Sequence, residues 1–356
     1  MLKPGLLPVW RDRDTVQIGI DSRRAVALTG MAGAACVIGL LDGSRDRAQI
    51  IDAAAARGIP VPTVERVLAL LASAGVLDDF PAGTLRLLSP PVRARLAAEL
   101  ATASLAHRDG DGGARTLARR VAASVRLHGG GRVGASLGDL LIAAGVGQVT
   151  HADPPAGSRA DPPAGSRADS RQGARPPGAA RAAANRPRVA RTTRPARRDR
   201  PPPASARPDL AILIGRCPQE LPAGLMRDQI PHLAISAGEA IGVVGPLVLP
   251  GHTACLRCLD LARADRDPAW PLILAQLTGR EPDPPACDAP LAAAVAAQAA
   301  FQTLAFLDRA TPARAVTNGT LELVLPGWQW RRRTWPRHPR CWCVAGNQPD
   351  NPIQRT

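Results

Sequence analysis

The first 90 residues combine a short alternating pattern with several helical ones. Apolar and polar positions alternate over residues 15–20 and 25–29, on either side of a polar turn, which predicts a β-hairpin. Apolar positions at helical spacing predict three helices, over residues 31–41, 45–57 and 62–76. Residues 83–88 fit a final strand. Two strands, three helices and a wing predict a small winged-helix-like α+β domain over residues 1–90.

From residue 123 onward, apolar runs of strand length alternate with helical patterns. The expected strands cover residues 123–128, 208–214, 232–236, 241–249 and 320–325, and several read as buried on both faces. A long apolar helix is expected over residues 288–307. This alternation predicts an α/β domain with a Rossmann-like sheet over residues 114–345. A helical segment, residues 91–113, would link it to the first domain.

The charge of the chain is concentrated in one place. The net charge is +15, and residues 154–208 carry 13 Arg against three Asp and no Glu, an excess of ten. This stretch is rich in Pro and Ala, and residues 152–159 recur as 160–167. Such composition favours a solvated insertion in the α/β domain over a nucleic-acid site, which stays the less favoured alternative. Residues 346–356 are expected to be a disordered tail.

The sequence also bounds the compartment and some chemistry. The N-terminal residues lack the apolar segment of a signal peptide, and no stretch approaches the roughly 20 uncharged apolar residues of a membrane span. A cytoplasmic protein without a membrane partner is therefore expected. Lys3 is the only lysine, which excludes a P-loop lysine or a Schiff-base lysine in the rest of the chain.

Two close pairs of cysteines give the strongest chemical signal. Cys255 and Cys258 are spaced C-x-x-C, and Cys341 and Cys343 are spaced C-x-C. Four thiolates in tetrahedral geometry suit Zn²⁺, and such a closed site is structural because no position is left for water. His338 could replace one sulfur. A redox C-x-x-C is the alternative for the first pair, and the second pair favours the metal.

A glycine-rich loop follows the strand expected at 123–128. Gly129, Gly131 and Gly134 form G-x-G-x-x-G, a helix is expected from residue 135, and Asp153 follows about 20 residues on. The glycines permit a tight turn and a close approach of phosphate to the N–H groups of a helix terminus. These four residues are the candidate ATP contacts.

The order of these motifs resembles the ThiF family of ubiquitin-activating-like proteins, which adenylate carboxylates. The motifs in question are GGGRVG, LLIAAGVGQVTHAD, PDLAIL, PGHTACLRCLDL and CWC. A narrower set, GPLVLPGHTACLRC, DRDPAWP and WRRRTWPRHPRCWC, is similar to the cyclodehydratase-associated ThiF-like proteins of thiazole/oxazole-modified peptide (TOMM) pathways, which include bacteriocin biosynthesis. The likeness covers roughly residues 7–345.

The resemblance implies a division of labour. The N-terminal part would be a PqqD-like domain that captures the leader peptide of a precursor, and the protein would present it to a YcaO-type partner. The leader would add as a strand to the edge of the hairpin near residues 15–20, with main-chain hydrogen bonds for affinity. A zinc knuckle would stabilise a ThiF-type sheet. The resemblance leaves a homodimer open.

One departure from the family bears on catalysis. In adenylating relatives an aspartate that holds Mg²⁺ follows a central strand, whereas here Ile214 is followed by Gly215 and Arg216. An arginine cannot hold the metal, so a vestigial nucleotide loop and a non-catalytic subunit are expected. Two alternatives stay open. One is an ATP-dependent adenylyltransferase acting on a carboxylate of a peptide or ubiquitin-like carrier protein. The other is a basic nucleic-acid-associated scaffold.

Overall fold

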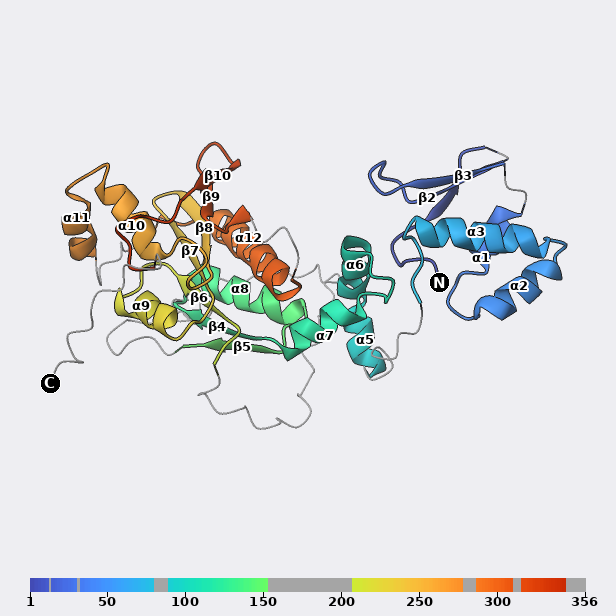
Figure 1. Ribbon diagram of the computed structural model, residues 1–356, viewed down its shortest axis with the longest axis horizontal. Helices are drawn as coiled ribbons and strands as arrows, with labels where there is room; N and C mark the ends of the chain where they lie inside the picture. Colours follow the sequence, from blue (N-terminus) through green and yellow to red (C-terminus); the bar gives the residue numbers. More distant parts are fainter. Residues whose placement is uncertain are drawn as a thin grey trace, which may run out of the picture. The chain divides into compact units, whose positions relative to one another are not determined.

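The computed structural model describes residues 1–12, 14–30, 33–79, 89–152, 207–277, 286–309 and 315–343 (Figure 1). Four sequence-based predictions lie outside these residues: the strand at 83–88, Asp153, almost all of the Arg/Pro-rich stretch at 154–208, and the tail at 346–356.

The N-terminal residues form a three-stranded antiparallel sheet covered by helices. The strands are β1 (Pro8–Trp10), β2 (Thr15–Ile18) and β3 (Val26–Thr29), in the order β1-β2-β3. The helices are α1 (Ala34–Gly39), α2 (Arg47–Ala55) and α3 (Val61–Ser73). Alternate strand residues, including Val16, Ile18 and Leu28, are buried with Val67 and Leu71 of α3 in one core. The predicted hairpin and its three helices are confirmed.

The expected position of the open edge is wrong. Residues 15–20 were expected to offer a free edge, but β2 pairs with β1 on one side, as in Val9↔Gln17, and with β3 on the other, as in Gln17↔Ala27. The sequence did not reveal β1 because it is only three residues long and begins with a proline. Within this sheet, the strands with a free side are β1 and β3.

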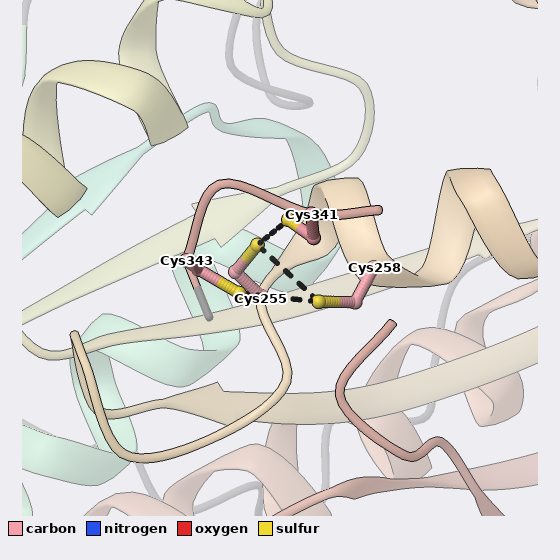
Figure 2. Close-up of side chains that lie close together, drawn as sticks. All are labelled: Cys255, Cys258, Cys341 and Cys343. Carbon is pink, nitrogen blue, oxygen red and sulfur yellow. Dashed lines mark hydrogen bonds between the residues drawn. The ribbon is translucent and has the colours of Figure 1, made fainter. Parts of the chain in front are cut away.

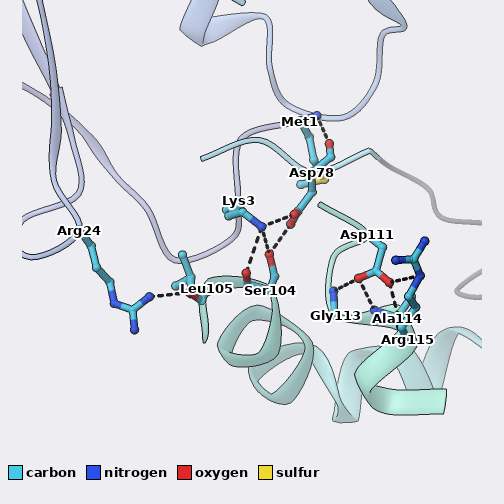
Figure 3. Close-up of polar contacts among 10 residues, drawn as sticks. All are labelled: Met1, Lys3, Arg24, Asp78, Ser104, Leu105, Asp111, Gly113, Ala114 and Arg115. Carbon is cyan, nitrogen blue, oxygen red and sulfur yellow. Dashed lines mark hydrogen bonds and ion pairs between the residues drawn. The ribbon is translucent and has the colours of Figure 1, made fainter. Parts of the chain in front are cut away.

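Three helices connect this part to the larger sheet: α5 (Pro90–Arg95), α6 (Ala97–His107) and α7 (Ala114–Ala122). The only lysine is buried at the first connection. The Nζ of Lys3 donates to Asp78 Oδ1 at 2.5 Å and to Ser104 Oγ on α6 at 2.8 Å (Figure 3). On α7, the guanidinium of Arg120 donates twice to the buried carboxylate of Asp308, at 2.9 and 2.7 Å. Each buried charge is thus paired, as its desolvation requires.

The larger sheet has seven strands in the order β10-β9-β8-β7-β6-β4-β5. The parallel strands are β4 (Ser124–His128), β5 (Gln148–His151), β6 (Leu210–Ile214) and β7 (His232–Gly238). The antiparallel strands are β8 (Ile241–Val248), β9 (Gly319–Val324) and β10 (Trp330–Thr334). The expected mixed α/β, Rossmann-like architecture is confirmed, and β10 is an addition to it.

Helices pack on this sheet. They are α8 (Gly131–Ala143), α9 (Glu220–Arg227), α10 (Leu256–Ala264) and α12 (Ala289–Leu307). Helix α11 (Trp270–Leu277) lies against α10. Helix α12 contacts α8, β7 and β8, and its residues Leu291, Val295 and Ala299 are fully buried. By length and composition alone, this helix could cross a membrane, which corrects the expectation that no stretch approaches that length. Its contacts make it a core helix of the α/β domain.

Candidate functional site

The four predicted cysteines meet in one buried cluster (Figure 2). Their Sγ atoms all lie within 4.8 Å of one another. The separations are 3.8 Å for Cys255 and Cys258, 3.5 Å for Cys255 and Cys341, and 3.3 Å for Cys258 and Cys343. Zn–S bonds of about 2.3 Å in a tetrahedron place the sulfurs about 3.8 Å apart, so the cluster fits Zn²⁺ with little movement.

The first pair is positioned by the start of α10. Cys255 lies at the N-cap with extended backbone, and the N–H of Cys258 donates to its carbonyl at 2.9 Å. This turn brings both thiols to the same side. The loop that precedes it is fixed by Thr253, whose Oγ1 accepts from the N–H of Leu249 at 2.8 Å. The loop after β8 therefore holds the Cys255–Cys258 turn in a defined conformation.

The second pair is tied to the first through Asn318. The Asn318 side-chain oxygen accepts from the N–H of Ala254 at 2.7 Å, and its carbonyl accepts from the N–H of Trp335 at 2.9 Å. A turn follows in which the N–H of Cys341 donates to the carbonyl of His338 at 2.9 Å. Asn318 lies in neither cysteine motif, and its neighbourhood in the sequence carries no signal of this role.

Without a metal, the thiols share protons unequally. The hydrogen bond from the Cys255 thiol lowers the pKa of Cys258 to about 4 and raises the pKa of Cys255. Burial raises the pKa of Cys341 to about 12. A bound Zn²⁺ would require four thiolates, so binding would release the protons that Cys255 and Cys341 hold. With no open coordination position, its contribution would be to folding.

His338 lies beside the cluster but is engaged elsewhere. Its Nε2 lies 2.7 Å from Asp265 Oδ2, and its Nδ1 accepts from the N–H of Arg340 at 3.2 Å. This pattern fits a neutral ring with the proton on Nε2. With both ring nitrogens in use and four sulfurs already gathered, His338 holds the turn and does not replace a ligand.

One of the tryptophans near the arginine run packs on the cluster. Trp335 is 2% exposed and belongs to the same core as the four cysteines, and its Nε1 donates to Thr320 Oγ1 at 3.0 Å. The guanidinium carbons of Arg333 and Arg263 lie 4.4 and 5.4 Å from its ring centre. Trp328 is exposed. Trp335 and the arginines on its ring therefore have a structural role around the four-cysteine cluster.

The glycine loop keeps a backbone shape suited to phosphate. Gly129 follows β4 with φ of 104°, and a Cβ there would lie 2.4 Å from the carbonyl oxygen of Ile214, so only glycine fits. Helix α8 begins at Gly131, four residues before the expected start at residue 135. Gly134 is thus within its first turn, where its N–H donates to the carbonyl of Gly130 at 3.3 Å. The sequence predicts a later start because of these glycines, but the helix begins among them.

The loop lies at a topological switch point. β4 pairs with β5 on one side and with β6 on the other, and ligands of open α/β sheets bind at the carboxyl ends of strands that diverge in this way. The N–H of Ala152 donates to Leu127 at 2.8 Å, and Asp153 follows directly, outside the described residues. Burial lowers the pKa of His128 at the end of β4.

The end of β6 lacks the aspartate of adenylating relatives. Gly215 has φ of 74°, and the Arg216 side chain that follows lies 3.8 Å from the carboxylate of Glu239. Glu239 belongs to the turn between β7 and β8 and was not a candidate from the sequence. The residues that directly follow β6 are therefore a glycine and a cation, neither of which supplies a carboxylate for Mg²⁺.

No family profile and no curated protein matches the sequence. Solved structures do match. The heterocyclase TruD shares 16% sequence identity at a TM-score of 0.60, and the match covers 96% of this chain and 42% of TruD. A heterocyclase in complex with substrate and cofactor shares 15% identity at a TM-score of 0.61, and the match covers 97% of this chain and 39% of that chain. E. coli MccB with AMPCPP and selenomethionine MccA shares 14% identity at a TM-score of 0.58, and the match covers 96% of this chain and 98% of MccB.

The chain thus spans about two fifths of the heterocyclases and nearly all of MccB. At these identities the likeness concerns the fold. The chain has the ThiF-like fold that TruD and MccB share, as its motifs predicted.

Proposed function

We propose that this protein binds the leader peptide of a ribosomally made precursor and presents it to a YcaO-type cyclodehydratase, without catalysing a reaction itself. The pathway would be of the TOMM type, as in bacteriocin biosynthesis. The observation that carries the proposal is a free strand edge on β3. In the larger sheet, the end of β6 also lacks the aspartate on which metal-assisted adenylation would depend.

The direction of the main-chain groups on β3 follows from the register. The N–H of Arg11 donates to the carbonyl of Thr15, so Thr15 and, by alternation, Gln17 direct their main-chain groups toward β1. Val16 and Ile18 then bond to β3, through their partners Leu28 and Val26.

The residues between those partners face the other way. Ala27 and Thr29 direct their N–H and carbonyl groups to the free side of β3, and both residues are exposed. This edge can accept a further strand with main-chain bonds at both positions. The small side chain of Ala27 leaves room for it.

The opposite edge is less suited. By the same alternation, Pro8 and Trp10 are the β1 residues that face outward. Proline has no N–H to donate, so one of the two donors of that edge is missing, a common means of blocking edge pairing. The asymmetry favours β3 as the docking edge.

The comparisons support a peptide ligand. MccB has been solved with MccA, and a related heterocyclase with its substrate, and the likeness to both spans nearly all of this chain. In TruD the shared fold makes up 42% of a longer chain.

A second candidate function is ATP-dependent adenylation of a peptide or carrier-protein carboxylate. The retained shape of the Gly129–Gly131 turn favours it, as does the likeness to MccB, which has been solved with ATP. The Arg216 position opposes it, because Mg²⁺ would lack its carboxylate. A nucleotide held by Gly129, Gly131, Gly134 and Asp153 would then have a structural or regulatory effect.

The docking edge can be tested by one substitution. Ala27→Pro removes an outward-facing N–H and leaves the bonds to β2 in place, because those come from Val26 and Leu28. The probe is a fluorescein-labelled peptide selected from a random library for binding to the full-length protein. Its affinity, measured by anisotropy, should weaken at least about tenfold, because one main-chain bond is lost and the proline ring blocks the edge. Ala27→Ser keeps the donor and is the matched control. Equal affinity of the Pro variant and the control would refute docking on β3.

A further inference from the structure

A basic hollow lies at the end of the N-terminal sheet. It has a volume of about 370 Å³ and is lined by Arg23, Arg24, Ala106 and Arg108. Arg23 and Arg24 belong to the turn between β2 and β3, and Ala106 and Arg108 lie at the C-terminal end of α6. Arg24 joins the two walls, because its guanidinium donates to the carbonyl of Leu105 (Figure 3).

Among the residues that the structure describes, two of the three arginines have no carboxylate partner. Arg23 is paired with Asp21, through two hydrogen bonds of 2.9 and 2.7 Å. Arg24 donates to a neutral carbonyl, and neither Arg24 nor Arg108 forms an ion pair with the carboxylates of the described ranges. The local positive charge is therefore only partly neutralised.

The nearest acidic residues along the chain are already engaged. Asp111 accepts from the N–H groups of Gly113, Ala114 and Arg115 and so caps the start of α7 (Figure 3). Asp109 interacts with Asp111, and burial together with that neighbour raises the pKa of Asp109. The hollow thus presents a guanidinium on each wall, a geometry that suits a carboxylate between them.

The turn that lines the hollow directly precedes β3 in the sequence. Arg24 precedes Ala27 by three residues, so their Cα atoms are at most about 10 Å apart. A strand paired with Ala27 and Thr29 that continues past the start of β3 reaches the turn that carries Arg23 and Arg24. The same peptide would then meet the basic hollow within two or three residues of its last main-chain bond.

We infer that the peptide bound on β3 carries Asp or Glu residues at the end that passes the turn, and that Arg24 and Arg108 bind their carboxylates. This inference rests on the proposed function and adds the chemistry that selects the peptide. The backbone edge accepts many sequences because it bonds to main-chain groups. Two guanidiniums at one end would fix both the direction of the peptide and its register.

The test is a display selection with random dodecapeptides as the probe, against the full-length protein. Wild-type protein should enrich peptides with Asp or Glu at one end, about threefold or more over the input. The double variant Arg24→Gln, Arg108→Asn should lose this bias, and asparagine tolerates the left-handed backbone at position 108, where φ is 56°. A selected acidic peptide should bind the double variant about fivefold to tenfold more weakly, as expected for two exposed ion pairs.

Arg57→Gln is the matched control, since Arg57 is an exposed arginine in the turn after α2. It should keep the wild-type bias. Selected peptides without acidic enrichment, or with the same enrichment in the double variant, would overturn this inference and leave the proposed function standing. Failure to capture any peptide whose binding is lost in Ala27→Pro would overturn the proposed function itself.

Discussion

Replacing one cysteine of the four-cysteine cluster should have a measurable structural cost. Cys258 is fully buried, and Cys258→Ser would leave three thiolates for a site built from four. The site joins the start of α10 to residues 335–343, a segment that follows the last strand and lies outside any helix or strand. That segment contributes Trp335 to the core around the cluster.

The magnitude follows from that burial. A tryptophan buries about 200 Å², worth about 5 kcal/mol at 25 cal/mol/Å². If the substitution loosens the segment, about half of this area becomes exposed, and the weakened metal site adds to the loss. The free energy of unfolding should then fall by about 3 kcal/mol. For a region of about 200 residues this lowers the Tm by about 6–12 °C.

The assay is elemental analysis together with thermal unfolding, before and after treatment with a chelator. Wild-type protein should contain about one zinc per chain, and chelation should lower its Tm in the same range as Cys258→Ser. Cys36→Ser is the control, because it makes the same chemical change in α1, outside the cluster. A metal-free wild-type protein whose Tm is unaffected by Cys258→Ser would refute the zinc centre.

Three further predictions concern other parts of the chain. The isolated protein should show no ATP–pyrophosphate exchange with Mg²⁺ and a peptide; robust exchange that is lost in Asp153→Ala would establish the adenylyltransferase alternative. Deleting residues 160–167, one copy of the repeat, should change the free energy of unfolding by less than about 0.5 kcal/mol, and loss of soluble protein would contradict a solvated insertion. Burial lowers the pKa of His232 from 6.5, and its Nε2 has no partner among the described residues. The unfolded chain therefore binds a proton that the folded protein does not, so stability should fall below about pH 6.5, by at most about 1.4 kcal/mol per pH unit. Urea unfolding should show a shallower pH slope in His232→Gln; an unchanged slope would exclude His232 as its source.

The elements with strong local patterns were predictable from the sequence. The hairpin, the buried strands and α12 each have a hydrophobic pattern of their own. The close spacing within each cysteine pair is enough to indicate metal ligands. What brings Cys258 and Cys343 to 3.3 Å is the path of the chain through β8, β9 and β10, which no local pattern encodes.

The features that the sequence did not reveal depend on pairing between distant segments. β1 has only three residues, one of which is a proline, and it forms a strand because it pairs with β2. β10 contains three consecutive arginines, without alternation, and is defined by its register with β9. Asn318 holds both cysteine loops although it belongs to neither motif. The open edge on β3 could be recognised only once both neighbours of β2 were known.

The central claim is that a peptide pairs with β3, and amide hydrogen exchange tests it most directly. In the free protein the outward amides of Ala27 and Thr29 should exchange rapidly, and those of Val26 and Leu28 slowly, because the latter bond to β2. Saturation with the tightest peptide from the selection should slow exchange at Ala27 and Thr29 by at least about tenfold. Tight binding that leaves these two amides unchanged and protects another part of the chain would contradict the account.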